Sequence, residues 1–98
     1  MEEEITLPMD EQVEEPTIQV LILMNRLLLI SKIEEVLADI GQPDCNLVKP
    51  YLILDDGSMI PWLSKLTKDT EIMISSDKIL TLVEPKKELL NEYLKLTK

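Results

Sequence analysis

The sequence has no histidine, one cysteine, two glycines and no phenylalanine among its 98 residues. Without histidine, the chain has no side chain that ordinarily titrates near neutral pH and no imidazole to bind a metal. One cysteine excludes both a thiolate metal cluster and an internal disulfide. Dinucleotide, phosphate-loop and nucleophile-elbow motifs need closely spaced glycines, which Gly41 and Gly57 do not provide. We therefore expect neither an enzyme nor a cofactor or metal site.

Charge is distributed unevenly along the chain. Acidic residues outnumber basic residues by 19 to 10, and residues 1–15 contain many of the acids and no base. An acidic run that also contains Pro8 buries too little apolar surface to offset its ordering entropy, so residues 1–15 are predicted to form a flexible acidic arm. This arm either keeps the protein soluble, or covers a basic surface or recruits a partner. Residues 16–98 are long enough for one domain with a single core.

Several features favour a cytoplasmic protein. The N-terminus is acidic where a secretory signal peptide is basic, and Cys45 has no disulfide partner. The most apolar stretch, residues 18–30, is interrupted by Asn25 and Arg26 and is shorter than the roughly 20 residues of a membrane-spanning helix. We therefore expect no association with a membrane.

The pattern over residues 17–83 is typical of β-strands. Two apolar runs, residues 18–24 and 27–36, flank Asn25 and predict a hairpin in which Asn25 takes a positive φ. The runs are continuously apolar, which indicates that both faces of the sheet are covered. In a domain of this size we expect another subunit to cover the second face.

The middle of the chain predicts a third strand, a turn and a further extended segment. The strand covers residues 45–54 and is at an edge or bulged at Pro50, because proline has no N–H to donate. The sequence Asp55-Asp56-Gly57 favours a turn over a cation site. Extended structure resumes at residues 59–63.

The C-terminal part predicts a second hairpin and a helix. Residues 71–75 and 78–83 are separated by a two-residue turn and predict a short, tight hairpin. After Pro85, apolar residues recur at helical spacing and predict an amphipathic helix over about residues 86–96. Its apolar stripe either caps an open end of the sheet, or docks into a partner's groove or onto a membrane surface.

Chemically distinctive side chains are few. The aromatic residues are Tyr51, Trp62 and Tyr93, too few for a surface that stacks several bases. Trp62 is more typical of packing than of base stacking. Cys45 has no neighbouring base in the sequence to activate its thiol and is interpreted as a small buried hydrophobic residue.

The order of these elements resembles the barrel of the Sm and LSm proteins over residues 17–83. Residues 20–26 resemble the family's first hairpin, and Asp44-Cys45-Asn46 resembles its Asp and Met-Asn element. Residues 74–79 have the shape of the second motif, with Ser75 in place of the arginine. With its helix at the C-terminus, the whole chain is most similar to a marine-metagenome Sm-like family of proposed cyanophage origin. The resemblance implies a mainly β fold, a small five-stranded, strongly bent Sm-like (SH3-like) barrel with a C-terminal α-helix.

The resemblance also implies a homo-oligomeric ring of about five to seven subunits. In that family the fourth strand of one subunit pairs with the fifth strand of the next, which closes sheet edges that would otherwise be open. Here those strands are residues 71–75 and 78–83. The candidate interface side chains are Ile72, Met73, Ile74, Ile79, Leu80 and Leu82.

Sm-like rings bind single-stranded, often uridine-rich RNA around the pore, so the resemblance implies a function in RNA metabolism. By position, Asn46 matches the base-binding asparagine and Ser75 replaces the arginine, while Lys49 and Lys78 supply charge nearby. A nearly neutral domain with an acidic arm lacks the positive charge of a tight nucleic-acid binder. The alternative is a protein-interaction or assembly module on the same scaffold without nucleic-acid binding. If the phage resemblance holds, the cytoplasm is that of the host.

Overall fold

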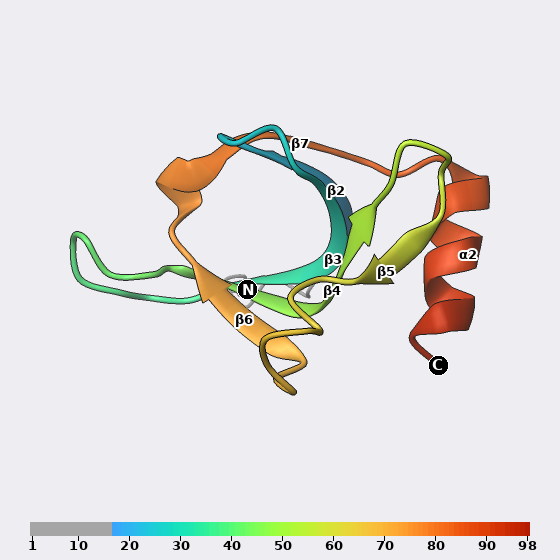
Figure 1. The fold of residues 1–98 in the computed structure, drawn as a ribbon. Coiled ribbons are helices and arrows are strands. Elements are labelled where there is room, and N and C mark those ends of the chain that lie inside the picture. The colour runs from blue at the N-terminus through green and yellow to red at the C-terminus, as the bar shows by residue number, and fades with distance from the viewer. Residues whose placement is uncertain (1–16) are drawn as a thin grey trace, which may run out of the picture.

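The computed structural model describes residues 17–98, which form one antiparallel sheet and a C-terminal helix (Figure 1). The predicted acidic arm, residues 1–15, lies outside the described residues. In chain order the elements are β2 (Thr17–Leu23), β3 (Leu28–Glu35), β4 (Cys45–Ile53), β5 (Met59–Pro61), β6 (Glu71–Ile74), the 3-10 turn η1 (Ser76–Lys78), β7 (Ile79–Val83) and α2 (Lys87–Leu96). The fold is mainly β, as predicted, and the sheet has six strands. The sixth is β5, which was predicted only as an extended segment.

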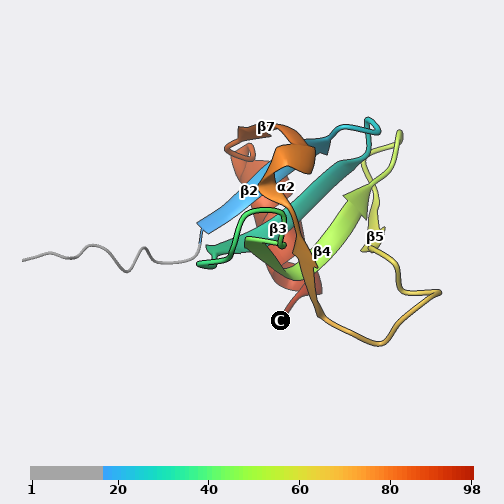
Figure 2. The same ribbon diagram turned by 90° about the vertical axis from the view of Figure 1, so that its left-hand side faces the viewer.

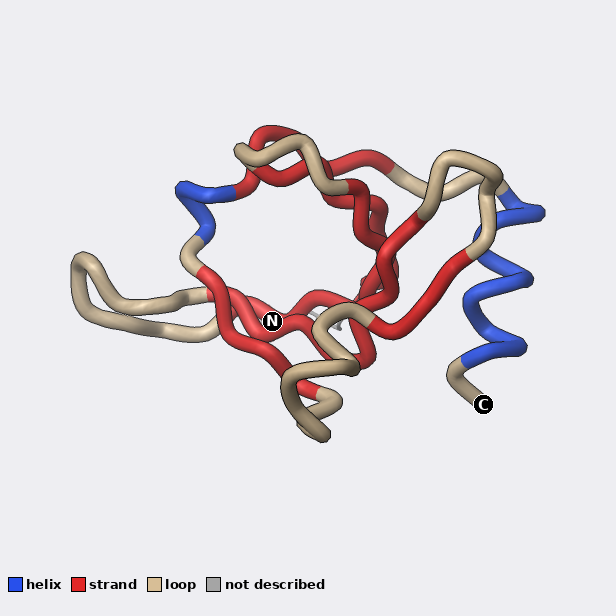
Figure 3. Tube along the Cα trace, in the orientation of Figure 1, coloured by secondary structure: helices blue, strands red, loops and turns tan. Residues whose placement is uncertain are grey.

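The strands follow the order β5-β4-β3-β2-β7, and β6 also pairs with β4. The predicted hairpin between residues 71–75 and 78–83 is therefore wrong. The turn η1 separates the two strands, so that β6 pairs with β4 and β7 pairs with β2. Figure 3 shows these segments curving around a common centre. Within residues 17–98 no strand ladder joins β6 to β7, so the barrel is not closed.

The first predicted hairpin is confirmed. The β2 and β3 strands pair from Thr17 opposite Ile33 to Ile22 opposite Leu28. The positive φ expected at Asn25 is found at Arg26, whose φ is 72°. The Asn25 Oδ1 atom instead accepts a hydrogen bond of 3.2 Å from the N–H of Leu27. Asn25 therefore stabilises the turn through its side chain, and its own backbone does not need a positive φ.

The third predicted strand is also confirmed, and it is bulged next to Pro50. Lys49 has a φ of 54°, and the pairing of β3 with β4 shifts register between Ile30 and Lys32. The bulge divides the other edge of β4 between two partners. The β6 strand pairs with residues 45–48, and β5 pairs with residues 51–53. The absence of an N–H at Pro50 suits this division, because no ladder bond is needed from it.

The two faces of the sheet bury two separate cores. Alternate residues of a strand point to opposite faces, so Leu29 belongs to one core and Ile30 to the other. The inner core lies within the curve of the sheet and consists of Leu21, Leu23, Leu29 and Leu47. The outer core consists of Ile30, Met59 and Tyr93, with half-buried residues of β2, β4 and α2 packed against it.

The helix α2 covers the outer face of the sheet (Figures 1 and 2). It therefore does not cap an open end, which corrects the preferred prediction. The second face of the sheet is covered by the chain's own helix, where the sequence had suggested another subunit. The helix has ten residues, and no helix within residues 17–98 combines the length and apolarity needed to cross a membrane.

Candidate functional site

The four candidate RNA-binding residues fall in three different places. Asn46 lies on the half of β4 that pairs with β6, and Lys49 lies in the β4 bulge. Ser75 precedes η1 and Lys78 is its last residue, and both line one pocket of about 460 Å³ together with the loop that connects β3 to β4. The structure therefore places Ser75 and Lys78 in one pocket, which neither Asn46 nor Lys49 lines.

Two carboxylates hold the side chain of Asn46. Its Nδ2 atom donates to Glu34 Oε1 at 3.0 Å and to Glu71 Oε1 at 2.9 Å. The strands β3 and β6 flank β4 and place one glutamate on each side of the amide. Both amide protons are thus engaged, and the surroundings are negatively charged. A base that used this amide as a donor would have to displace a carboxylate, and its phosphate would be repelled.

A second polar contact fixes the start of η1. Asp44 Oδ1 accepts from the N–H of Ser76 at 2.7 Å, and Asp44 Oδ2 accepts from Ser76 Oγ at 2.7 Å. These hydrogen bonds favour the ionised carboxylate and lower the pKa of Asp44. The bond from the Ser76 hydroxyl has the larger effect, and the bond from the Ser76 N–H has the next largest. The sequence singled out Asp44 only as part of a motif. Nothing near it in the sequence indicates this partner, which lies 32 residues away.

Lys49 contacts the C-terminal end of α2. Its Nζ donates to the carbonyl oxygen of Thr97 at 3.0 Å, a favourable position because helix carbonyls carry partial negative charge there. Lys49 also lines a different pocket from Lys78, one that includes Trp62. Sequence reasoning placed Lys49 near the RNA site, because it could not show that the bulge turns this residue toward the helix.

The candidate interface residues divide into two groups of three. Met73, Leu80 and Leu82 are exposed, with Leu80 exposed at 60%. Ile72, Ile74 and Ile79 are half-buried, and the last two of these pack against the inner core. The exposed group lies on strands that each have one unpaired edge in this structure. Apolar side chains on an open strand edge are unusual, because such edges pair readily with other strands.

The remaining chemistry-bearing side chains have structural roles. Asp56 accepts from both the N–H and the hydroxyl of Ser58, which lowers its pKa and fixes the predicted turn, where Gly57 has a φ of 89°. Cys45 is buried, as predicted, and burial raises the pKa of its thiol. In the part of the chain that the structure describes, no three Asp, Glu, Cys or His side chains converge as metal ligands would.

Comparison with known proteins gives a family but no activity. No curated protein matches the chain. A family model described as a family of unknown function, DUF6561, matches residues 16–98. The matched residues include every strand of the sheet and the helix α2. The chain therefore belongs to the DUF6561 family.

Proposed function

We propose that this chain is a subunit of an Sm-like ring, in which copies join through β6 and β7. The observation that carries this proposal is that, within residues 17–98, β6 and β7 each combine an unpaired strand edge with exposed apolar side chains. On this proposal the protein is an assembly scaffold of the cytoplasm, where the lone thiol of Cys45 stays reduced. The bent sheet, the η1 corner and the C-terminal helix are the features that support the Sm-like description.

The two edges are suited to pair with each other. Within residues 17–98, the outer edges of β6 and β7 present backbone N–H and C=O groups without strand partners. Met73 on β6 is exposed at 43%, and Leu80 and Leu82 on β7 are also exposed. Pairing β6 of one copy with β7 of the next would satisfy the backbone groups and bury these side chains. Because the contact is head-to-tail, repeated copies close into a ring when the rotation between neighbouring copies returns the last copy to the first.

The molar mass in solution tests the ring. We expect light scattering after size exclusion to give a mass several times the 11.3 kDa of one chain. Leu80→Lys and Met73→Lys each place a charge at the interface, and both variants are expected to elute as monomers with an unchanged circular dichroism spectrum. Leu37→Lys is the matched control, because Leu37 is fully exposed in the loop after β3. A monomeric wild-type chain, or edge variants that keep the wild-type mass, would refute the ring.

A second candidate function is weak binding of single-stranded RNA at the η1 corner. The observation that favours it is the pocket shared by Ser75 and Lys78, because a ring would repeat this pocket in every subunit. Repetition converts weak contacts into measurable avidity. Asn46 contributes only if RNA displaces Glu34 or Glu71 from its amide.

Fluorescence anisotropy with labelled oligo-uridine at low salt tests this second candidate. We expect Lys78→Gln to weaken binding several-fold and to reduce the salt dependence, because each phosphate contact releases counterions. Lys86→Gln removes another exposed charge, just before α2, and is expected to leave binding unchanged. If no oligo-uridine binds even at low salt, the protein functions as an assembly module without nucleic acid.

A further inference from the structure

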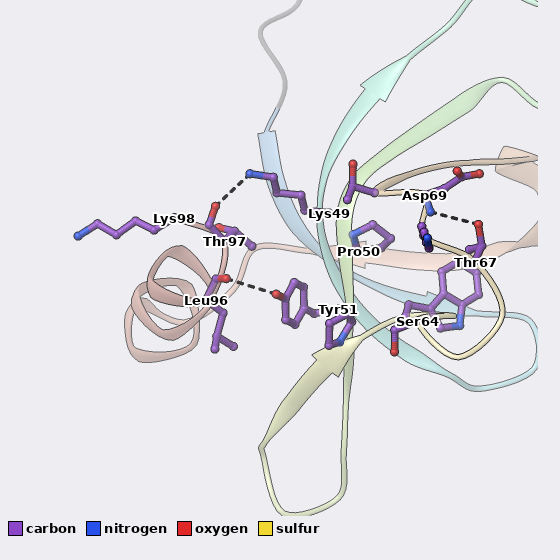
Figure 4. Close-up of a pocket in the computed structure, with 13 residues that line it drawn as sticks. Lys49, Pro50, Tyr51, Ser64, Thr67, Asp69, Leu96, Thr97 and Lys98 are labelled. Carbon is purple, nitrogen blue, oxygen red and sulfur yellow. Dashed lines mark hydrogen bonds between the residues drawn. The ribbon is translucent and has the colours of Figure 1, made fainter.

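A pocket opens where β5 and β6 separate along β4. Its volume is about 420 Å³, within the range of roughly 300–1,000 Å³ that is typical of small-molecule sites. Pro50 lies between its two sides, as Figure 4 shows: the C-terminal end of α2 is on one side and the loop after β5 is on the other. The bulge holds that loop through a hydrogen bond from Lys49 N–H to the Thr70 carbonyl at 2.6 Å. The pocket is thus a gap built into the sheet edge.

Two aromatic side chains line the pocket, one from each face of the sheet: Tyr51 from the outer face and Trp62 from the inner face. Trp62 is half-buried and packs against the inner core, which restricts the motion of its ring. The Tyr51 ring stands edge-on to Tyr93, with centroids 5.8 Å apart, and its hydroxyl donates to the Leu96 carbonyl at 3.3 Å. These contacts orient both rings before any ligand arrives, so little ordering entropy opposes stacking on them.

The rim of the same pocket is positively charged. Lys49 and Lys68 line it, against the single acidic side chain of Asp69, while the side chain of Lys98 extends away from the pocket (Figure 4). This local excess of positive charge contrasts with the whole chain, whose net charge is −9. The contact of Lys49 Nζ with the Thr97 carbonyl uses one of its three protons, which leaves donors for an anion. Hydroxyl groups of Ser64 and other loop residues add further donors.

We propose that this pocket binds a small planar aromatic molecule that carries a phosphate or carboxylate group. Trp62 stacks on the ring of the ligand, and the lysines bind its anionic group as point charges. The pocket at η1 lacks aromatic residues, and a third pocket, beside Arg26, includes two aspartates. The proposal does not depend on ring assembly, because one protomer supplies every lining residue.

Adenosine monophosphate is a suitable probe, because it joins a planar aromatic base to a phosphate. Its binding can be followed by fluorescence, since Trp62 is the only tryptophan in the chain. We expect titration of the full chain with this nucleotide to change Trp62 fluorescence to saturation. Adenosine alone and inorganic phosphate alone are each expected to bind more weakly. Lys68→Gln is expected to weaken nucleotide binding about fivefold, as loss of one partly exposed charge contact does. Lys87→Gln, an exposed lysine of α2 outside the pocket, is the matched control.

A short single-stranded oligonucleotide with a 5′-phosphate identifies the source of the ligand. Tighter binding of the mononucleotide would indicate a free small molecule, and tighter binding of the oligonucleotide would indicate the end of a strand. Either result supports the pocket if Lys68→Gln weakens it and Lys87→Gln does not. The proposal is overturned if neither probe changes Trp62 fluorescence and calorimetry also detects no binding. It is equally overturned if the two lysine variants bind alike.

Discussion

The hydroxyl of Tyr93 is the polar link between α2 and the sheet. It donates toward the carbonyl oxygens of Lys49 at 2.8 Å and Val48 at 3.1 Å, and it accepts from the N–H of Lys32 at 3.3 Å. These groups belong to the bulged part of β4 and the adjacent residues of β3. One side chain therefore satisfies backbone groups that the bulge removes from the regular ladder.

Replacing this hydroxyl is expected to destabilise the fold. Tyr93→Phe keeps the ring but removes a partner from part-buried backbone groups of β3 and β4, which costs about 1–3 kcal/mol of unfolding free energy. Tyr51→Phe is the matched control, because its hydroxyl bond to Leu96 is exposed and its loss is expected to cost less. Urea unfolding at pH 7 measures both values. Equal losses in the two variants would contradict the structural role of Tyr93.

The same variant has a characteristic pH dependence. Burial, the largest cause, raises the pKa of Tyr93 in the folded state above its ordinary value near 10. The stability that this group contributes is complete below pH 10 and is lost as pH rises toward the folded pKa, because the unfolded chain ionises first. We therefore expect the stability difference between wild type and Tyr93→Phe to shrink above pH 10. A constant difference up to pH 11 would show that Tyr93 does not titrate as described.

At the scale of elements, one face of the helix α2 packs against the sheet and the other face is exposed. Leu89 is half-buried and packs against the outer core, whereas Leu94 is exposed at 46%. Leu89→Ala is expected to reduce the free energy of unfolding by about 1–2 kcal/mol, in proportion to the apolar area that it loses. Leu94→Ala makes the same chemical change on the same helix and is expected to cost less than about 0.5 kcal/mol. Thermal or urea unfolding compares them, and similar losses would place the helix on a different face.

Local sequence patterns predicted most of these elements but not all of their partners. The β2–β3 hairpin, the bulge at Pro50 and the C-terminal helix follow from short-range signals, and all are present. The pairing of β6 and β7 was predicted wrongly because a two-residue gap between apolar runs is also typical of a hairpin. The corner at η1 is fixed by Asp44, which is distant in the sequence and which no local pattern connects to it.

At the scale of the whole molecule, the candidate RNA site was only partly predictable. The Sm-like resemblance put Ser75 and Lys78 in one candidate site, and these two residues share a pocket. Residue types and spacing could not reveal the carboxylates beside Asn46, because Glu34 and Glu71 come from strands that only the folded sheet brings next to it. The charged aromatic pocket was missed for the same reason. Its walls come from the bulge, from the loop after β5 and from the end of the helix.

The two edges proposed to join copies belong to different strands, β6 and β7, and this gives a single protomer a direction. Any assembly built through these edges would be polar: every protomer would present its β6 edge to one neighbour and its β7 edge to the other. A protomer with only its β6 edge blocked could still end a growing chain through β7, and the reverse holds for a protomer blocked at β7. Mixing the two kinds would yield pairs and nothing larger. Each blocked protomer that joins an assembly of intact protomers would stop that assembly from closing into a ring. A small fraction of blocked protomers would therefore disrupt a much larger number of intact ones.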